Sequence, residues 1–137
     1  MTESSAHYTL VERLLEDMRT QFGPVDDLCI LIDDGSVPLD SRPPSIGGKI
    51  PDVHIRSVGS ARLLALGEAK TAQDVDTEHT RLQLAEYFRY LKHHASPFLV
   101  LAVPWHKKPL IASIAAKIQA ECGATNVTVI VLNDCPG

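Results

Sequence analysis

The sequence is poor in cysteine and in aromatic residues, and it contains no long hydrophobic run. Its three cysteines, Cys29, Cys122 and Cys135, stand at no metal-ligand spacing, and an odd number suits a reducing compartment. No apolar run approaches the roughly 20 residues of a membrane-spanning helix. The first residues, 1–5, lack the basic and hydrophobic parts of a secretory signal. The sequence therefore predicts a soluble, cytoplasmic protein that neither crosses a membrane nor depends on disulfides.

Positive charge is also scarce. The chain has 13 Lys and Arg residues against 17 Asp and Glu residues, which gives a formal net charge of −4. A free-standing protein that binds nucleic acid tightly normally shows a basic face, so this balance argues against that class. Any nucleic-acid function would have to work through a local patch, a metal ion, a homodimer or a partner protein. At 137 residues the chain, 1–137, is expected to form a single domain.

Hydrophobic periodicity predicts an alternation of helices and strands. The expected elements are a helix over 8–22, strands over 28–32, 50–55 and 63–70, a helix over 77–94, a strand over 97–103, a helix over 109–123 and a strand over 126–132. The first helix is expected to bury a stripe made of Tyr8, Val11, Leu14, Leu15, Met18 and Phe22. Asp33 and Asp34 are expected to be turn residues, and 36–49 a loop. Hairpin strands followed by strand-helix-strand units predict the α/β class, with a mixed sheet flanked by helices.

Charged residues interrupt two of the predicted strands. Asp52 follows Pro51 in the first of them, and Glu68 and Lys70 are two residues apart in the next. Alternate residues of a strand point to one face, and the short connection over 56–62 would set Asp52 beside that pair. Two carboxylates and an ammonium group are costly in an apolar sheet unless a cation lies between the carboxylates. We therefore predict an active site at Asp52, Glu68 and Lys70.

These residues and the element order resemble the PD-(D/E)xK nuclease superfamily, which has the restriction-endonuclease-like fold. The motifs that carry the resemblance are Pro51-Asp52 and Glu68-Ala69-Lys70. In that family an αβββαβ core holds the Asp on its second strand and the E-x-K on its third. The resemblance covers residues from about Tyr8 to Val103, and leaves the last helix and strand as a C-terminal α-β extension.

A third motif lies on the helix expected after the second charged strand. The run Gln83-Leu84-Ala85-Glu86-Tyr87 is similar to the Q-x-x-x-Y motif of the RecB-like branch of the superfamily. The resemblance implies that Gln83 is a further catalytic residue and that Tyr87 contacts nucleic acid. Two other interpretations stay open. Gln83 would form a capping box with Thr80 unless Thr77 or Asp76 is the N-cap, and Tyr87 would also suit the helical core.

The resemblance implies a metal-dependent nuclease that hydrolyses DNA. Carboxylate oxygens suit Mg²⁺ or Mn²⁺, so Asp52 and Glu68 are the expected ligands, with the carbonyl of Ala69 as a third. A cation there would polarise the scissile phosphate and make hydroxide available near neutral pH. Lys70 would orient that water or stabilise charge in the transition state. The resemblance further implies products with 5′-phosphate and 3′-hydroxyl ends.

Other residues are expected to surround this centre. Glu12 or Glu16 of the first helix would add a carboxylate ligand, and Glu12 is preferred. Lys49 and Arg81 are expected to contact phosphate, because the predicted order places them beside the site. Trp105-His106-Lys107-Lys108 would either stack on nucleic acid or form an ordinary loop, and the loop is the preferred interpretation.

An alternative function is a non-catalytic module of the same fold. Such a module would serve as an interaction platform in a larger DNA-processing or defence complex, and the acidic net charge supports it. The presence of all three expected site residues favours the nuclease. The sequence has no nucleophile elbow, P-loop or dinucleotide-binding glycine pattern that would indicate another class of enzyme.

Overall fold

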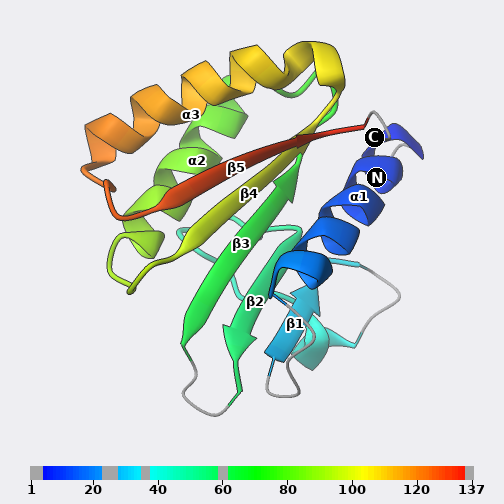
Figure 1. Cartoon of the computed structure of the whole chain (residues 1–137), viewed down its shortest axis with the longest axis vertical. Helices are drawn as coiled ribbons and strands as arrows, with labels where there is room; N and C mark the ends of the chain where they lie inside the picture. Colours follow the sequence, from blue (N-terminus) through cyan, green and yellow to red (C-terminus); the bar gives the residue numbers. More distant parts are fainter. Residues whose placement is uncertain (1–4, 23–27, 35–37, 59–61, 135–137) are drawn as a thin grey trace.

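The computed structural model of the chain describes residues 5–22, 28–34, 38–58 and 62–134. Within these ranges a five-stranded sheet lies between one helix on one face and two helices on the other (Figure 1). The helices and strands are α1 (Ser5–Phe22), β1 (Leu28–Ile32), β2 (Val53–Ser57), β3 (Leu63–Ala69), α2 (Glu78–Leu91), β4 (Phe98–Val103), α3 (Lys108–Cys122) and β5 (Thr128–Asn133).

The strands follow one another across the sheet in sequence order. β1, β2 and β3 pair antiparallel, whereas β3, β4 and β5 pair parallel. Helices α2 and α3 make the crossovers that the parallel pairs require. The predicted α/β class, with a mixed sheet flanked by helices, is confirmed. In the described part of the chain, no helix has both the length and the apolarity needed to cross a membrane.

The face of the sheet beneath α1 is lined by small side chains. Ala65 and Ala69 of β3 are buried there, and Gly67 lies between them. A Cβ atom on Gly67 would lie 2.7 Å from Met18 Sδ and 3.1 Å from a methyl carbon of Leu14. The missing side chain therefore lets α1 pack directly on the backbone of β3.

The opposite face, beneath α2 and α3, holds larger side chains. Leu66 of β3 and Leu101 of β4 are buried against Tyr87 and Phe88 of α2 and Ile111 of α3. Burial of this apolar surface is the dominant stabilising contribution in a domain of this kind. Because α2 lies on this face, its side chains approach the residues of β3 that point away from α1.

The boundaries of the charged strands differ slightly from the expected ones. β2 begins at Val53, so Asp52 immediately precedes the strand, and β3 ends at Ala69, so Lys70 immediately follows it. Both residues still continue the alternation of their strands, and Lys70 N–H donates to the carbonyl of Ala102 in β4 at 2.9 Å. The charged residues therefore lie at the end of the sheet, where water and ligands can reach them.

The start of α2 decides between two interpretations of Gln83. Thr77 is the N-cap, and its side-chain oxygen accepts a hydrogen bond from the backbone N–H of Thr80 at 3.1 Å. Thr80 therefore lies inside the helix. The capping box between Thr80 and Gln83 is not formed, which leaves the side chain of Gln83 to other partners.

The expected loop over 36–49 contains regular structure in its described part. A short 3₁₀ helix, η1 (Leu39–Ser41), is followed by a tight turn at Gly47 and Gly48. Ile46 and Lys49 exchange two backbone hydrogen bonds across this turn, and the two glycines have φ angles of 58° and 82°. Left-handed conformation at both central residues is what glycine supplies in such turns. The turn fixes the start of the segment that leads to Asp52.

Candidate active site

A cleft of about 740 Å³ opens at the end of the sheet where β3 finishes. The starts of α1 and α2 and the segment before β2 complete its walls. The lining residues are His7, Asp33, Ile50, Asp52, Glu68, Ala69, Lys70, Thr71, Gln73, Asp74, Thr77, His79 and Gln83. The structure thus brings together the residues that the sequence predicts as catalytic: Asp52, Glu68, Lys70 and Gln83.

Asp52 is held at the junction of the sheet and α1. It is buried, and its Oδ2 atom accepts a hydrogen bond from the backbone N–H of Ala69 at 2.8 Å. The Nε2 atom of His7, in the first turn of α1, lies 3.4 Å from the same oxygen. One carboxylate oxygen is therefore fixed by the protein on two sides.

Glu68 is the most perturbed acid of the cleft. Its side chain is buried, its Oε1 atom accepts a hydrogen bond from the Tyr87 hydroxyl at 2.9 Å, and Lys70 Nζ lies 3.6 Å from Oε2. Burial raises the pKa of Glu68 well above its usual value, and the charge of Asp52 raises it further. Lys70 and the Tyr87 hydrogen bond oppose this shift only in part. Two carboxyl groups close enough to share a hydrogen bond thus meet in a site that disfavours two negative charges.

Tyr87 lies beneath the cleft, with its hydroxyl turned toward Glu68. Its side chain has no exposed surface, because it also belongs to the core between the sheet and α2. Burial, followed by the charge of Glu68, raises the pKa of Tyr87. The hydroxyl therefore stays protonated and donates to Glu68 at any ordinary pH. Because Tyr87 is fully buried, it is not exposed for the direct contact with nucleic acid that was expected. Its hydroxyl instead positions Glu68.

Gln83 lies one helical turn before Tyr87 and lines the cleft. Its side chain is 6% exposed and is hydrogen-bonded to the Tyr87 hydroxyl. Among the described residues its Oε1 atom is buried without a hydrogen-bond partner. An unpaired buried acceptor costs roughly 1–3 kcal/mol. Gln83 therefore presents an oxygen that a bound cation or water would satisfy.

His7 and Asp33 are among the cleft residues that were not predicted from the sequence. His7 reaches Asp52 from α1, and Asp33, expected only to form a turn, lines the cleft beside Asp52. The backbone N–H of Asp33 donates to the carbonyl of Asp52 at 2.9 Å. Neither residue stands in a recognisable motif. Only the register of β1 on β2 and the orientation of α1 bring them to the site.

Lys49 does not line the cleft, but its charge acts on His79, which does. Slight desolvation lowers the pKa of His79, an exposed residue at the start of α2. The positive charges of Lys70 and Lys49 lower it further, while Asp74 opposes the shift. Two lysines therefore act on the same histidine at the edge of the cleft. This edge is the cationic side of an otherwise acidic site.

Glu12 does not reach the cleft. Helix α1 buries Leu10, Leu14 and Met18 against the sheet, whereas Tyr8, expected in the stripe, is 49% exposed. Glu12 stands about 200° around the helix from Leu10, and it is exposed. Glu16 stands in the same relation to Leu14. Both carboxylates therefore point away from the sheet, and α1 contributes His7 instead.

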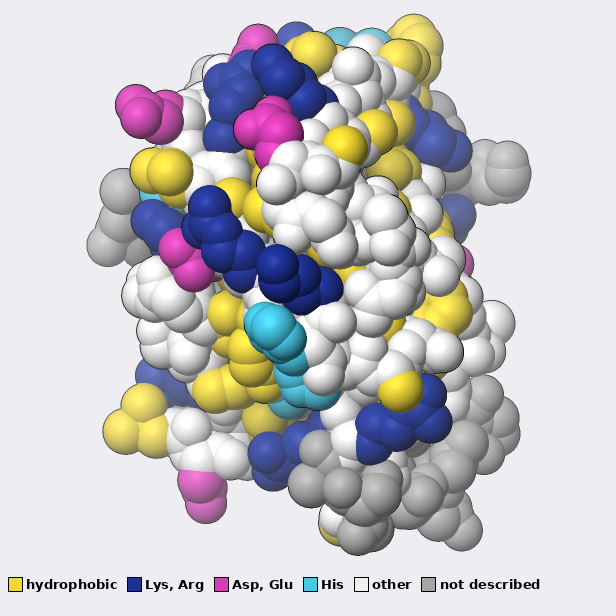
Figure 2. All heavy atoms as spheres, turned by 90° about the vertical axis from the view of Figure 1, so that its left-hand side faces the viewer, with side chains coloured by type: hydrophobic (Ala, Val, Ile, Leu, Met, Phe, Trp, Pro, Cys, Tyr) yellow, Lys and Arg dark blue, Asp and Glu magenta, His cyan; other side chains and the backbone are white. Residues whose placement is uncertain are grey.

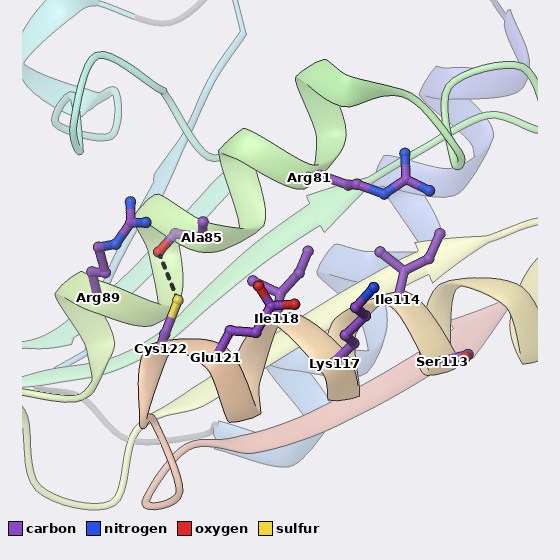
Figure 3. Close-up of a pocket in the computed structure, with 9 residues that line it drawn as sticks. All are labelled: Arg81, Ala85, Arg89, Ser113, Ile114, Lys117, Ile118, Glu121 and Cys122. Carbon is purple, nitrogen blue, oxygen red and sulfur yellow. Dashed lines mark hydrogen bonds between the residues drawn. The ribbon is translucent and has the colours of Figure 1, made fainter.

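Arg81 lies on a different surface from the cleft. It forms an ion pair with Asp76 and lines a groove of about 530 Å³ between α2 and α3 (Figure 3). Arg89 and Lys117 also line this groove, and Arg89 pairs with Glu86 at 3.2 Å. On this side of the molecule, Lys and Arg side chains gather in groups with single acidic side chains among them (Figure 2).

Comparisons of the chain with protein-family models, with curated proteins and with solved structures give no match.

The donor atoms of the cleft suit a hard divalent cation. Asp52 and Glu68 place two carboxylates side by side, and Gln83 adds an unpaired amide oxygen. Mg²⁺ and Mn²⁺ prefer oxygen ligands, and Mg²⁺ commonly binds through one or two carboxylates while it keeps several waters. Within the described ranges no three His, Cys, Asp or Glu side chains are grouped as metal ligands.

We expect replacement of Tyr87 by phenylalanine to weaken divalent-cation binding. The change removes the 2.9 Å hydrogen bond that orients Glu68 and leaves the volume of the core unchanged. Loss of such a supporting hydrogen bond typically reduces metal affinity by about 10- to 100-fold. Titration of Mn²⁺ against the thermal unfolding midpoint measures the affinity. Tyr90→Phe, on the same helix, is the matched control, and equal Mn²⁺ affinity in Tyr87→Phe and the native chain would contradict the assigned role.

Proposed function

We propose that the chain is a metal-dependent nuclease that hydrolyses phosphodiester bonds of DNA, and that it belongs to the restriction-endonuclease-like fold. The observation that carries the proposal is the convergence of Asp52, Glu68 and Lys70 in one cleft at the end of the sheet. The order of helices and strands also agrees with an αβββαβ core followed by an α-β extension.

Asp52 and Glu68 would hold Mg²⁺ or Mn²⁺, together with the Oε1 atom of Gln83 or water. When bound, the cation supplies Lewis-acid polarisation of the scissile phosphate. The chain keeps its ligands in place before binding: Ala69 N–H fixes Asp52, and Tyr87 fixes Glu68. Preorganised ligands of this kind do not have to be reordered during the reaction.

Lys70 supplies the positive charge that the chain itself brings to the site. Its ammonium group is 3.6 Å from Glu68 and largely buried, so its charge acts in a poorly screened environment. There it would stabilise the negative charge that develops on the phosphate oxygens during attack. Lys49 lies at the same edge and would contact a flanking phosphate. With a net charge of −4, the chain would need a homodimer or a partner protein for a firm grip on DNA.

The proposal is tested by cleavage of labelled DNA. The substrates are a linear duplex, a single strand, a nicked circle and a four-way junction, each incubated with Mg²⁺, Mn²⁺ or EDTA. We expect cleavage with either cation and none with EDTA. Asp52→Asn should reduce the rate about a thousandfold, because the cation contributes several kcal/mol to the stabilisation of the transition state.

The control variant is Glu121→Gln, which alters an exposed carboxylate on α3 and should cleave like the native chain. Cleavage that persists in Asp52→Asn would show that the site is misassigned. Failure of the native chain to cut any substrate with either cation would favour the non-catalytic interaction module.

A further inference from the structure

The geometry points to a stacking platform for nucleobases at Trp105, and we propose that this platform binds single-stranded DNA next to the cleft. The inference rests on the proposed function and names the form of the substrate. It is carried by the exposure of Trp105, by its place in the fold and by the charges that follow it.

Trp105 is the single tryptophan of the chain, and its side chain is 63% exposed. It begins a short 3₁₀ helix, η2 (Trp105–Lys107), that leads directly into α3, so this segment is not the ordinary loop that was expected. Its backbone N–H donates to Asp134 Oδ1 at 2.9 Å, and its ring meets the His106 ring edge-on at 5.6 Å. A fixed backbone thus presents a large aromatic side chain to solvent.

The platform lies at the same end of the sheet as the cleft. Ala102 of β4 accepts a hydrogen bond from the backbone N–H of Lys70, the residue that follows Glu68 and Ala69. Trp105 follows Ala102 by three residues, which span at most about 11 Å of chain. The ends of β3 and β4 lie together in Figure 1, near the start of α1. A strand whose phosphate lies at Lys70 would therefore pass close to Trp105.

The residues after Trp105 complement a polyanion. His106 and Lys108 are exposed and Lys107 is half-buried, and all three follow the tryptophan directly. Such a combination of an aromatic ring with neighbouring cations binds single strands without strong sequence preference, because every base has a face that can stack. The bases of an intact duplex are already stacked on one another, so the ring favours an unpaired strand.

The single tryptophan makes the test direct, because its fluorescence reports on Trp105 alone. The native chain is titrated in EDTA with a short oligothymidylate, with a duplex of matched length and with heparin, which carries charge but no bases. We expect quenching by the oligothymidylate and little change with the duplex or heparin. An unchanged signal with the oligothymidylate would overturn the proposal, as would equal quenching by heparin.

A second measurement uses the affinity of the variants for the oligothymidylate. Trp105→Ala should weaken binding roughly 5- to 100-fold, and Trp105→Phe should retain most of the affinity. Lys107→Ala should weaken binding less and reduce its salt dependence by about one counterion. Equal affinity in Trp105→Ala and the native chain would rule out stacking.

The two proposals fail in different ways. Quenching and a Trp105→Ala defect without cleavage under any metal would support the platform and refute the nuclease. Metal-dependent cleavage with no Trp105→Ala defect in binding would support the nuclease and refute the platform. A concentration-dependent fluorescence shift without DNA would identify the exposed ring as a contact between copies of the chain, and would also refute the platform.

Discussion

Replacing Glu68 with glutamine is expected to reduce metal-dependent cleavage strongly while making the protein more stable. The substitution removes one of two carboxylates that would bind the cation, so cleavage should fall about a thousandfold. The neutral amide keeps an acceptor for the Tyr87 hydroxyl and removes a buried charge that faces Asp52. Because burial and the charge of Asp52 disfavour the ionised form of Glu68 more than Lys70 and Tyr87 favour it, the substitution should raise the free energy of unfolding at neutral pH without metal.

The pH dependence of this stability difference has a definite sign. Folding raises the pKa of Glu68 above its ordinary value of 4.5, so the folded chain holds a proton that the unfolded chain releases. Below pH 4.5 both states are protonated, and the variant should match the native chain. Above that pH the native chain loses up to about 1.4 kcal/mol per pH unit relative to the variant, until Glu68 ionises in the folded state.

Urea unfolding of both proteins across pH 4 to 8, without metal, measures the difference. His54 does not interfere: burial lowers its pKa to about 4, but it titrates in both proteins and cancels in the comparison. With added Mn²⁺ the native chain should become the more stable of the two proteins, because the cation stabilises only the protein that binds it. If the Glu68→Gln variant is less stable than the native chain at neutral pH, the claim that Glu68 is destabilised by its burial beside Asp52 is wrong.

Replacing Lys70 with methionine is expected to reduce kcat by about 100- to 1,000-fold and to leave metal binding intact. The ammonium group is the cationic side chain paired with Glu68 in the cleft, and loss of one group that stabilises transition-state charge typically has this effect. The two carboxylates remain, so the increase of the unfolding midpoint with Mn²⁺ should persist. Asp52→Asn and Glu68→Gln, in contrast, should lose that increase.

Single-turnover cleavage with saturating Mn²⁺ measures the rate of Lys70→Met. Lys70→Arg keeps the charge but changes its geometry, so it should recover part of the loss. A native rate in Lys70→Met would exclude the lysine from the reaction. Loss of Mn²⁺ binding in Lys70→Met would mean that the lysine shapes the site and does not act on the phosphate.

Much of this fold follows from local patterns in the sequence. Glu68 and Lys70 are two residues apart, so they point to the same face of their strand. A short connection links this strand to the one that follows Asp52, and these two facts are sufficient to predict that the three side chains meet. The apolar run over 97–103 is typical of a strand covered on both faces, and in β4 every residue from Leu99 to Val103 is buried. These features depend on residues that are close in sequence or on a single alternation.

The site residues that could not be predicted from the sequence are those whose position depends on how a helix is rotated about its axis against the sheet. The apolar residues of α1 fit more than one stripe, and the helix buries Leu10 where Tyr8 was expected. That rotation moves Glu12 away from the sheet and leaves His7 over Asp52. The role of Tyr87 could not be predicted either, because its ring packs in the core while its hydroxyl donates a hydrogen bond to Glu68 in the cleft.

The glycine at position 67 makes the cleft sensitive to an event on the far side of the sheet. Any larger residue there would require Met18, Leu14 or α1 itself to move, because its Cβ atom would lie 2.7 Å from Met18 Sδ. The same helix carries His7, so an outward shift of α1 would draw the imidazole away from Asp52 without altering any residue of the cleft. The spacing between α1 and β3 therefore sets the distance between His7 and Asp52, and a substitution at Gly67 can change that spacing from a position outside the cleft.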